Sequence, residues 1–189
     1  RDDADIYWFG AGYGHDIITD VRGFVLWGDD DIVKFRPEVT TSNIELAVSG
    51  ADLVITIDGY ADKLTVEDQF GVSSYESGVE QFHFDDGTIW TLDDVLVHLA
   101  TDGDDYIVGF DRDDILAGGL GNDILSGSAG NDTYIYDLGD GADTIIETAS
   151  LTWSGTADRI VLGAGILPGQ VTVSRAADLY DLVLTFVDG

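Results

Sequence analysis

A nine-residue period in the middle of the chain constrains the fold most strongly. From Ala100 onward, four units follow one another: ATDGDDYIV, GFDRDDILA, GGLGNDILS and GSAGNDTYI. In each unit an aspartate is followed two residues later by an apolar or aromatic residue, and residues 141–145 (GADTI) repeat the pattern after a two-residue slip. A period of nine fits neither an α-helix nor a plain strand, but it suits a six-residue turn followed by a three-residue strand. Two units would then form one coil, and successive coils would stack as parallel strands about 4.8 Å apart.

This stacking predicts two vertical rows of aspartates. Asp105 and Asp123 are two units apart and share one edge, which Asp143 continues after the slip, while Asp114 and Asp132 share the opposite edge. Two carboxylates about 5 Å apart repel by about 3 kcal/mol at an effective dielectric constant near 20. Residues 100–145 hold 11 aspartates and one arginine, so the stack needs cations between its turns. Hard oxygen ligands in irregular geometry favour Ca²⁺ over zinc, copper or Mg²⁺.

Residues 118–126 (GGLGNDILS) resemble a complete copy of the G-G-x-G-x-D-x-U-x repeat of RTX proteins. The resemblance implies a parallel β-roll in which each turn offers its aspartate and backbone carbonyl oxygens to calcium ions above and below it. For the first ion it implies Thr101, Gly103, Asp105, Gly118, Leu120 and Asp123. For the second it implies Phe110, Arg112, Asp114, Gly127, Ala129 and Asp132. For the third it implies Gly119, Gly121, Asp123, Leu138, Asp140 and Asp143, with Asp140 acting through its carbonyl.

Some repeat units depart from the family pattern. Phe110 and Arg112 stand where the family prefers glycine, and the first unit lacks its opening glycine pair. A side chain and a positive charge in the second turn make the second ion the least favoured of the three. The alternative, a flexible Asp-Gly linker, does not explain a hydrophobic residue held at fixed phase through four units.

A longer repeat spans the rest of the chain. Residues 5–18 align without gaps to residues 132–145 at an offset of 127, and Gly28 and Asp31 meet Gly155 and Asp158 at the same offset. We therefore expect partial RTX turns in 1–20, a β-rich intervening module ending in a short helix in 21–99, RTX β-roll repeats in 100–145, and the start of a second intervening module in 146–189. The chain reads as a window from a protein with several such repeats.

The intervening module is predicted to be rich in strands. Residues 44–48, 53–57 and 81–84 have strand-like patterns, the Asp86-Gly87 turn leads to a further strand at 88–90, and Thr91 begins a helix that runs to about Leu99. The segment VEQFHFDDGTIWTL resembles the haemolysin-type calcium-binding-related module of large RTX proteins. Asp5 and Asp16 occupy the aspartate positions of two repeat-like turns and are predicted metal ligands. Asp29, Asp30 and Asp31 read either as calcium ligands or as a solvated turn.

Charge and motif content exclude several functions. The formal net charge of −29 opposes binding to nucleic acid or anionic membranes. Aspartate outnumbers glutamate 31 to 6, cysteine is absent, and no apolar run is long enough for a membrane span. The three histidines lack metal-ligand spacing and no G-x-S-x-G motif occurs, so we predict no catalytic residues and no enzyme activity.

The resemblance implies an all-β, Ca²⁺-folded structural module of a large secreted bacterial RTX protein, exported by a type I secretion machinery. Two alternatives remain open. The chain could be a carbohydrate- or surface-binding segment of an adhesin that uses exposed aromatic residues: Trp8, Tyr13, Trp27, Trp90 and Trp153. It could also be an auxiliary module of an extracellular enzyme whose catalytic residues lie elsewhere.

Overall fold

The computed structural model describes residues 4–19, 30–71, 78–147, 157–175 and 182–186. The chain is mostly β-structure with one α-helix, as the sequence predicts. In the first half of the chain the elements are β1 (Ile6–Phe9), β2 (His15–Ile18), β3 (Ile32–Phe35), β4 (Ile44–Ser49), β5 (Asp52–Ile57), β6 (Lys63–Val66), β7 (Gln81–His83), β8 (Ile89–Thr91) and α1 (Leu92–Leu99). In the second half they are β9 (Tyr106–Val108), β10 (Ile115–Ala117), β11 (Ile124–Ser126), β12 (Thr133–Tyr136), β13 (Thr144–Ile145), β14 (Arg159–Leu162), a 3₁₀ turn (Pro168–Gln170), β15 (Val171–Arg175) and β16 (Leu182–Phe186).

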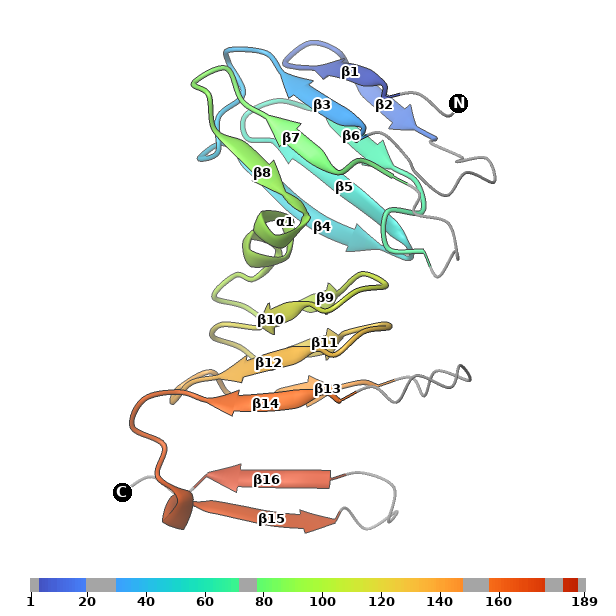
Figure 1. Ribbon diagram of the computed structural model, residues 1–189. Helices are drawn as coiled ribbons and strands as arrows, with labels where there is room; N and C mark the ends of the chain where they lie inside the picture. The colour runs from blue at the N-terminus through green and yellow to red at the C-terminus, as the bar shows by residue number, and fades with distance from the viewer. Residues whose placement is uncertain (1–3, 20–29, 72–77, 148–156, 176–181, 187–189) are drawn as a thin grey trace.

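The N-terminal unit, which comprises the described residues from 4 to 99, contains two sheets (Figure 1). One sheet has the order β1-β3-β7-β8, with β1, β3 and β7 parallel; the other has the order β2-β6-β5-β4, with β2 and β6 parallel. Alternation along β5 buries Leu53, Ile55 and Ile57. The apolar faces of the two sheets thus supply the core of this unit.

Helix α1 joins the N-terminal unit to the repeats. Its first turn is fixed by Asp94, whose carboxylate accepts hydrogen bonds from the backbone N–H and the hydroxyl of Thr91, each at 2.8 Å. A carboxylate at this end also meets the positive end of the helix dipole. The helix buries Val95, Leu96 and Leu99 and packs against β4, β8, β9 and β10.

Below α1, strands β9 to β14 form two parallel sheets, β9-β11-β13 and β10-β12-β14, which we call the C-terminal roll (Figure 1). Tyr106 pairs with Ile124 and Ile115 with Thr133, which confirms the coil of two nine-residue units. Ile124 pairs with Thr144, which confirms the two-residue slip. The repeated hydrophobic residues face inward and are at most 2% exposed: Ile107, Leu116, Leu125 and Tyr134. The predicted β-roll is therefore confirmed.

One continuous core runs through the N-terminal unit and the roll. At their junction the rings of Phe70 and Phe110 stack with centroids 5.2 Å apart. Arg112 bonds Asp93 of α1 at 2.5 Å. The two residues that break the glycine pattern of the repeat therefore connect the roll to the structure above it.

The longer repeat is visible in the structure. Strand β14 lies 127 residues after β3, and β15 lies 127 residues after β4. The backbone repeats as well, because Ile32 N–H donates to Asp5 O and Arg159 N–H donates to Asp132 O, both at 2.9 Å. Strands β15 and β16 form an antiparallel hairpin, and Phe186 stacks on Tyr136 of the roll at 4.5 Å. In the described part of the chain, no helix is long and apolar enough to cross a membrane.

Candidate metal centres

Each edge of the roll carries a column of aspartates joined by hydrogen bonds from backbone to side chain. In every step the N–H of one aspartate donates to Oδ1 of the aspartate one coil further along the chain. The steps are Asp105 to Asp123 at 2.9 Å, Asp123 to Asp143 at 3.2 Å, Asp114 to Asp132 at 2.9 Å and Asp132 to Asp158 at 3.0 Å. The structure therefore stacks the carboxylates in the two columns that the period predicts.

Three aspartates of the columns also have a buried carboxylate oxygen that accepts no hydrogen bond. Asp114, Asp123 and Asp132 are 2%, 0% and 1% exposed, and Oδ1 of Asp114 and Oδ2 of Asp123 and Asp132 accept no hydrogen bond from any described residue. A Cβ on Gly118 would collide with Oδ2 of Asp123, so this oxygen folds over the first glycine of its own turn. A buried anionic oxygen without a partner is costly. The columns fit a bound cation.

Backbone carbonyls face the same turns from the coil above. The carbonyl oxygen of Gly103 lies so close to Gly121 that a Cβ there would collide with it, and Arg112 O and Gly121 O stand in the same relation to Gly130 and Gly141. Gly121, Gly130 and Gly141 all have positive φ, at 136°, 150° and 114° respectively. The turns thus combine hard carbonyl and carboxylate oxygens, the donor set that Ca²⁺ takes.

The structure gathers the residues predicted for the first ion. A Cβ on Gly119 would lie 2.9 Å from the carbonyl oxygen of Thr101, so this carbonyl and that of Gly103 both face the turn that holds Gly118 and Leu120. In the upper turn, the N–H of Thr101 donates to Oδ2 of Asp105 at 2.6 Å. The exposed side chain of Leu120 leaves its backbone as the part that can face an ion.

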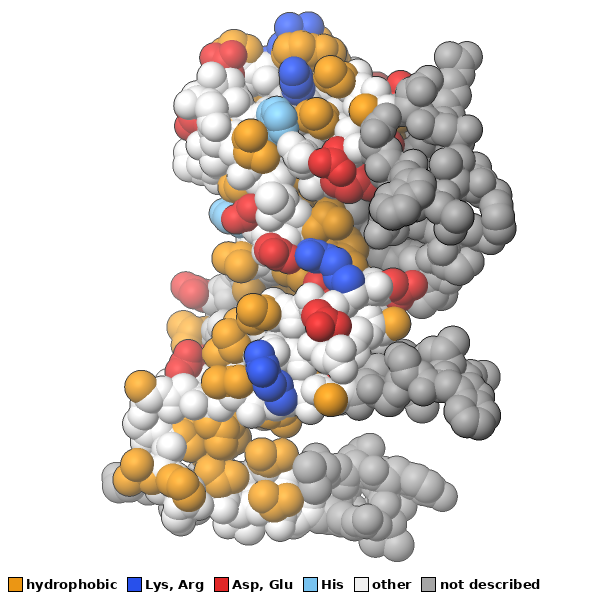
Figure 2. Space-filling view, viewed as in Figure 1, with side chains coloured by type: hydrophobic (Ala, Val, Ile, Leu, Met, Phe, Trp, Pro, Cys, Tyr) orange, Lys and Arg blue, Asp and Glu red, His pale blue; other side chains and the backbone are white. Residues whose placement is uncertain are grey.

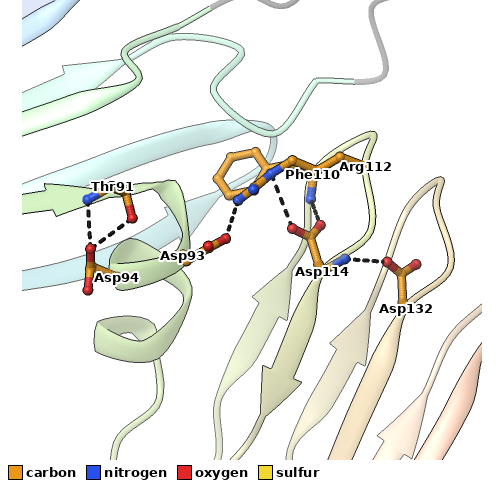
Figure 3. A network of polar contacts seen from close by, with 7 residues as sticks. All are labelled: Thr91, Asp93, Asp94, Phe110, Arg112, Asp114 and Asp132. Atoms are coloured by element: carbon orange, nitrogen blue, oxygen red, sulfur yellow. Dashed lines mark hydrogen bonds and ion pairs between the residues drawn. The ribbon is translucent and has the colours of Figure 1, made fainter.

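The turns predicted to hold the second ion are arranged differently (Figure 3). The carbonyl of Phe110 accepts a hydrogen bond from Arg112 N–H at 2.8 Å. Nε of Arg112 lies 3.4 Å from Oδ1 of Asp114, the oxygen that has no hydrogen bond. On the facing turn, which contains Ala129, Oδ2 of Asp132 folds over Gly127, just as Oδ2 of Asp123 folds over Gly118. The Arg112 guanidinium thus already neutralises part of this column, as its position in the sequence suggests.

At the third predicted ion, the N–H of Asp123 donates to Oδ1 of Asp143. The carbonyl of Asp140 accepts a hydrogen bond from Gly121 N–H at 2.7 Å. Leu138 lies in the same turn with its side chain exposed. This carbonyl therefore keeps only one lone pair for a metal ion.

The electrostatics of the columns oppose ionisation in the absence of a cation. Burial raises the pKa of Asp114 to about 6, and the carboxylates of Asp132 and Asp93 add to the increase, although Phe110 N–H and the Arg112 guanidinium oppose it. Burial and neighbouring carboxylates also raise the pKa of Asp123, Asp132 and Asp143. Protons or metal ions would both relieve this repulsion.

The N-terminal unit carries a related column. Asp5 N–H donates to Oδ1 of Asp31 at 2.7 Å, and Asp31 N–H donates to Oε2 of Glu80 at 2.6 Å. Asp31 is buried, which does not fit a solvated turn at this position, whereas Asp30 accepts a bond from Gln81 and Asp29 lies outside the described residues. Asp16 lies in β2 opposite Leu64, and no described residue donates a hydrogen bond to its carboxylate.

The sequence analysis missed three carboxylates that accept backbone hydrogen bonds: Asp158 and Glu80, which belong to the columns, and Asp62, which lies outside them. Asp158 follows Asp132 by 26 residues, so the nine-residue period does not reach it, although the 127-residue offset pairs it with Asp31. Asp62 accepts bonds from the N–H groups of Gly12 at 3.0 Å and Gly14 at 2.5 Å. No local motif marks Asp62 or Glu80, because the strands that place them pair over long separations.

Comparison with known families agrees with this geometry. The model of the RTX calcium-binding nonapeptide repeat matches residues 99–134 and 108–145. The model of the haemolysin-type calcium binding protein related domain matches residues 52–94. A search of curated proteins finds no match. RTX repeats are typically non-catalytic, Ca²⁺-binding structural modules. The chain therefore carries RTX calcium-binding nonapeptide repeats, preceded by a haemolysin-type calcium-binding-related domain.

Proposed function

We propose that this chain is a Ca²⁺-folded structural module of a large secreted bacterial RTX protein. The observation that carries the proposal is the set of buried carboxylate oxygens on Asp114, Asp123 and Asp132 that lack hydrogen bonds. Such oxygens make the metal-free roll unfavourable and provide ligands for a divalent cation.

The proposed ligands are the three predicted sets, with carbonyl oxygens supplied by the turns and carboxylates by the columns. The first set is the most complete, because both upper carbonyls face the turn below and no positive side chain intervenes. The second set competes with Arg112 for Asp114. Asp5 and Asp16 are proposed as ligands at the N-terminal edge, where Asp5 already belongs to a column.

The proposed organisation keeps residues 100–145 as the repeat block and 146–189 as the start of a second module. The described parts of 1–20 and 21–99 belong to one unit, since β1 pairs with β3 and β2 pairs with β6.

Calcium would act as a folding switch. Extracellular modules typically bind Ca²⁺ with dissociation constants of about 10⁻⁴ to 10⁻³ M. At a tenfold excess over that constant, each site adds about 1.4 kcal/mol to the folded state. The first and third sites share Asp123, and all three lie in one stack of coils, so they are expected to fill together. The roll would stay unfolded at low cytosolic calcium and fold outside the cell.

The proposal that the protein is secreted rests on the family of the repeats. RTX repeats are typical of secreted bacterial proteins, and export through a type I secretion machinery accords with a segment that folds only after it meets calcium. This part of the proposal is tested by following export of the intact protein from its host.

The folding switch is tested by circular dichroism of the whole chain, titrated from chelator to millimolar Ca²⁺. We expect a steep gain of β-signal with Ca²⁺ and a much smaller one at the same concentration of Mg²⁺, which keeps its water ligands. A β-signal already complete in chelator would contradict the proposal, as would one that stays absent at saturating calcium.

Binding of carbohydrate is a second candidate, favoured by the exposed aromatics at the N-terminal edge. Trp8 is 50% and Tyr13 is 43% exposed, whereas Trp90 is 5% exposed, and Trp27 and Trp153 lie outside the described residues. The Arg36 guanidinium lies 4.5 Å from the centre of the Trp8 ring and covers one face. A glycan-array screen of the calcium-loaded chain, with Trp8→Ala as control, tests this function. A role as auxiliary module of an extracellular enzyme stays open in the same way and would place the chemistry in another part of that protein.

A further inference from the structure

Three carboxylates converge at the lower end of the second aspartate column. Asp132 precedes β12, Glu147 follows β13 and Asp158 precedes β14, and each offers an oxygen within 4.8 Å of the other two. Calcium binds oxygen at about 2.3–2.6 Å, so oxygens on opposite sides of one ion lie about 5 Å apart. All three side chains can therefore reach a single ion.

A buried oxygen of Asp132 points into this cluster without a partner. Asp132 is buried and its Oδ2 accepts no hydrogen bond from the described residues. A Cβ on Gly127 would collide with this Oδ2 and would lie 2.5 Å from the hydroxyl of Tyr134. Since that hydroxyl bonds to Glu147, the free oxygen of Asp132 is on the side of the column where Glu147 lies.

Tyr134 holds Glu147 in place. The buried Tyr134 donates its hydroxyl proton to Oε1 of Glu147, which fixes the carboxylate and leaves its second oxygen for another ligand. Burial raises the pKa of Glu147, and the charges of Asp158 and Asp132 add to the increase, although the hydrogen bond from Tyr134 opposes it. Among the described ion pairs, Arg112 serves Asp93 and Asp114, and none reaches the three clustered carboxylates. Their combined charge thus has no ion-pair partner among the described residues.

The nonapeptide pattern does not assign this cluster. The repeat match ends at residue 145, so Glu147 and Asp158 both lie beyond it. The same three acidic positions recur in the sequence 127 residues earlier, as Asp5, Asp20 and Asp31. Asp20 lies outside the described residues, and the recurrence is one of sequence.

We propose that Asp132, Glu147 and Asp158 bind one additional Ca²⁺ ion, which closes the lower end of the second column with a glutamate from outside the repeats. The proposal rests on the calcium-binding function proposed above and adds one site to it. Tyr134 acts as the residue that positions Glu147.

The test is isothermal titration calorimetry of the full chain with Ca²⁺ alone. It compares the number of bound ions and their affinities in Glu147→Gln and in the unmodified sequence. The amide oxygen of Gln can still accept the Tyr134 hydroxyl, so the substitution removes the charge and keeps the hydrogen bond. We expect one fewer Ca²⁺ bound per chain, or a loss of affinity of at least tenfold at one site. Glu45→Gln, an exposed position on β4, removes the same charge elsewhere and should leave the number of ions unchanged.

A crystal structure of the unmodified chain grown in Ca²⁺ provides the direct measurement, which does not depend on whether a variant folds. An ion bound by Glu147 together with Asp132 or Asp158 supports the proposal. Ions in the other turns with none at Glu147, or a Glu147→Gln variant that keeps both the number of bound ions and their affinities, would overturn this inference while leaving the proposed function intact. A chain that binds no calcium at all would overturn both.

Discussion

The aspartates of the columns use their two oxygens for different purposes. Asp123 gives Oδ1 to the N–H of Asp105, while its Oδ2 is buried without a hydrogen bond. An asparagine could keep the first bond because its amide oxygen is also an acceptor, but it could not supply an anionic second oxygen. Asn122 shows that amides do occur in these turns, where it donates to Asp104 at the surface. The charge of Asp123 is therefore needed for something other than the backbone bond.

Asp123→Asn should stabilise the metal-free chain and reduce the stabilisation that calcium adds. In chelator, removal of one of two carboxylates about 5 Å apart relieves about 3 kcal/mol of repulsion, so the metal-free chain gains stability. In calcium, the loss of a ligand shared by two proposed ions should weaken binding at least tenfold, or about 1.4 kcal/mol. Urea unfolding with and without calcium measures both effects.

Asp104→Asn is the matched control, because Asp104 lies in the turn next to Asp105 but is exposed. It should have little effect under either condition. Destabilisation of Asp123→Asn in chelator would show that the buried charge is not a source of strain in the metal-free roll.

Stability of the metal-depleted chain should fall as pH rises from about 4 to about 6. The folded-state pKa of Asp114 is raised to about 6, above the ordinary value of about 3.9. Its stabilising contribution is therefore complete below pH 4 and is lost as the carboxyl ionises, by about 3 kcal/mol for a shift of two units. Thermal unfolding across this range measures the effect, and Asp114→Asn should flatten it.

Calcium should reverse this pH dependence, since only the ionised carboxylates bind the metal. Asp94 does not interfere, because the N–H of Thr91 lowers its pKa and its contribution is lost only below pH 4. A metal-depleted chain that becomes more stable between pH 4 and 6 would contradict the assignment of Asp114 as a strained, buried acid.

At the scale of the elements, the turns depend on close approach between coils. Gly121 has a φ of 136°, and its missing side chain leaves room for the carbonyl oxygen of Gly103. Gly87, in the turn between β7 and β8, has a φ of 92° with no atom within 4 Å of a Cβ position. The two glycines separate the effect of backbone conformation from the effect of contact between coils.

Gly121→Ala should destabilise the calcium-loaded chain more than Gly87→Ala does. Both variants incur the cost of a positive φ, about 1–3 kcal/mol. Only Gly121→Ala also pushes a carbonyl of the proposed first ion out of place, so it alone should lower calcium affinity. Thermal melts with and without calcium, paired with calcium titration, compare them. Equal losses and equal affinities would show that the Gly103 carbonyl has no part in binding.

The repeated elements could be predicted from sequence because the period itself defines their geometry. The inward positions of Ile107 and Leu125, the 18-residue register and both aspartate columns of the repeats all follow from one coil of two units. The short helix was also predicted, since Thr91 marks its start, and the structure adds the bonds from Thr91 to Asp94. These features depend on residues that are close in the sequence or repeat at fixed spacing.

Other features depend on pairings that sequence spacing does not encode. Strand β3 pairs with β1 and β7 over separations of 26 and 49 residues, which places Asp31 between Asp5 and Glu80. Glu147 joins Asp132 because the buried Tyr134 hydroxyl needs an acceptor, and that requirement appears only once the roll is packed. Of the aromatic residues named for sugar binding, Trp8 lies half exposed at the edge, whereas Trp90 is buried.

At the scale of the whole molecule, the roll is joined to the N-terminal unit by the two residues that break its pattern. Phe110 stacks on Phe70, and Arg112 pairs with Asp93 on α1. Figure 2 shows basic side chains beside acidic ones at the level where α1 meets the roll in Figure 1. We expect these contacts to make the two parts unfold as one cooperative unit.

Phe110→Ala should uncouple the two parts. Truncation of a buried phenylalanine typically costs 3–5 kcal/mol, about the upper range for a single core residue, and here the loss falls on the junction. Calorimetry of the calcium-loaded chain should change from one unfolding transition to two. Tyr106→Ala, an exposed aromatic on the same roll, is the control and should leave one transition. A single transition in Phe110→Ala would show that the junction is held by other contacts.

The hydrogen bonds of the columns run in one direction along the chain. The amide of each aspartate is satisfied by a carboxylate from the coil that is synthesised after it, as in Asp105 to Asp123 and Asp114 to Asp132. A coil that leaves a ribosome or a narrow pore N-terminus first therefore has no acceptor for this amide until about 18 further residues have emerged. The hydrogen bonds of a column can therefore form only after one further full coil has emerged.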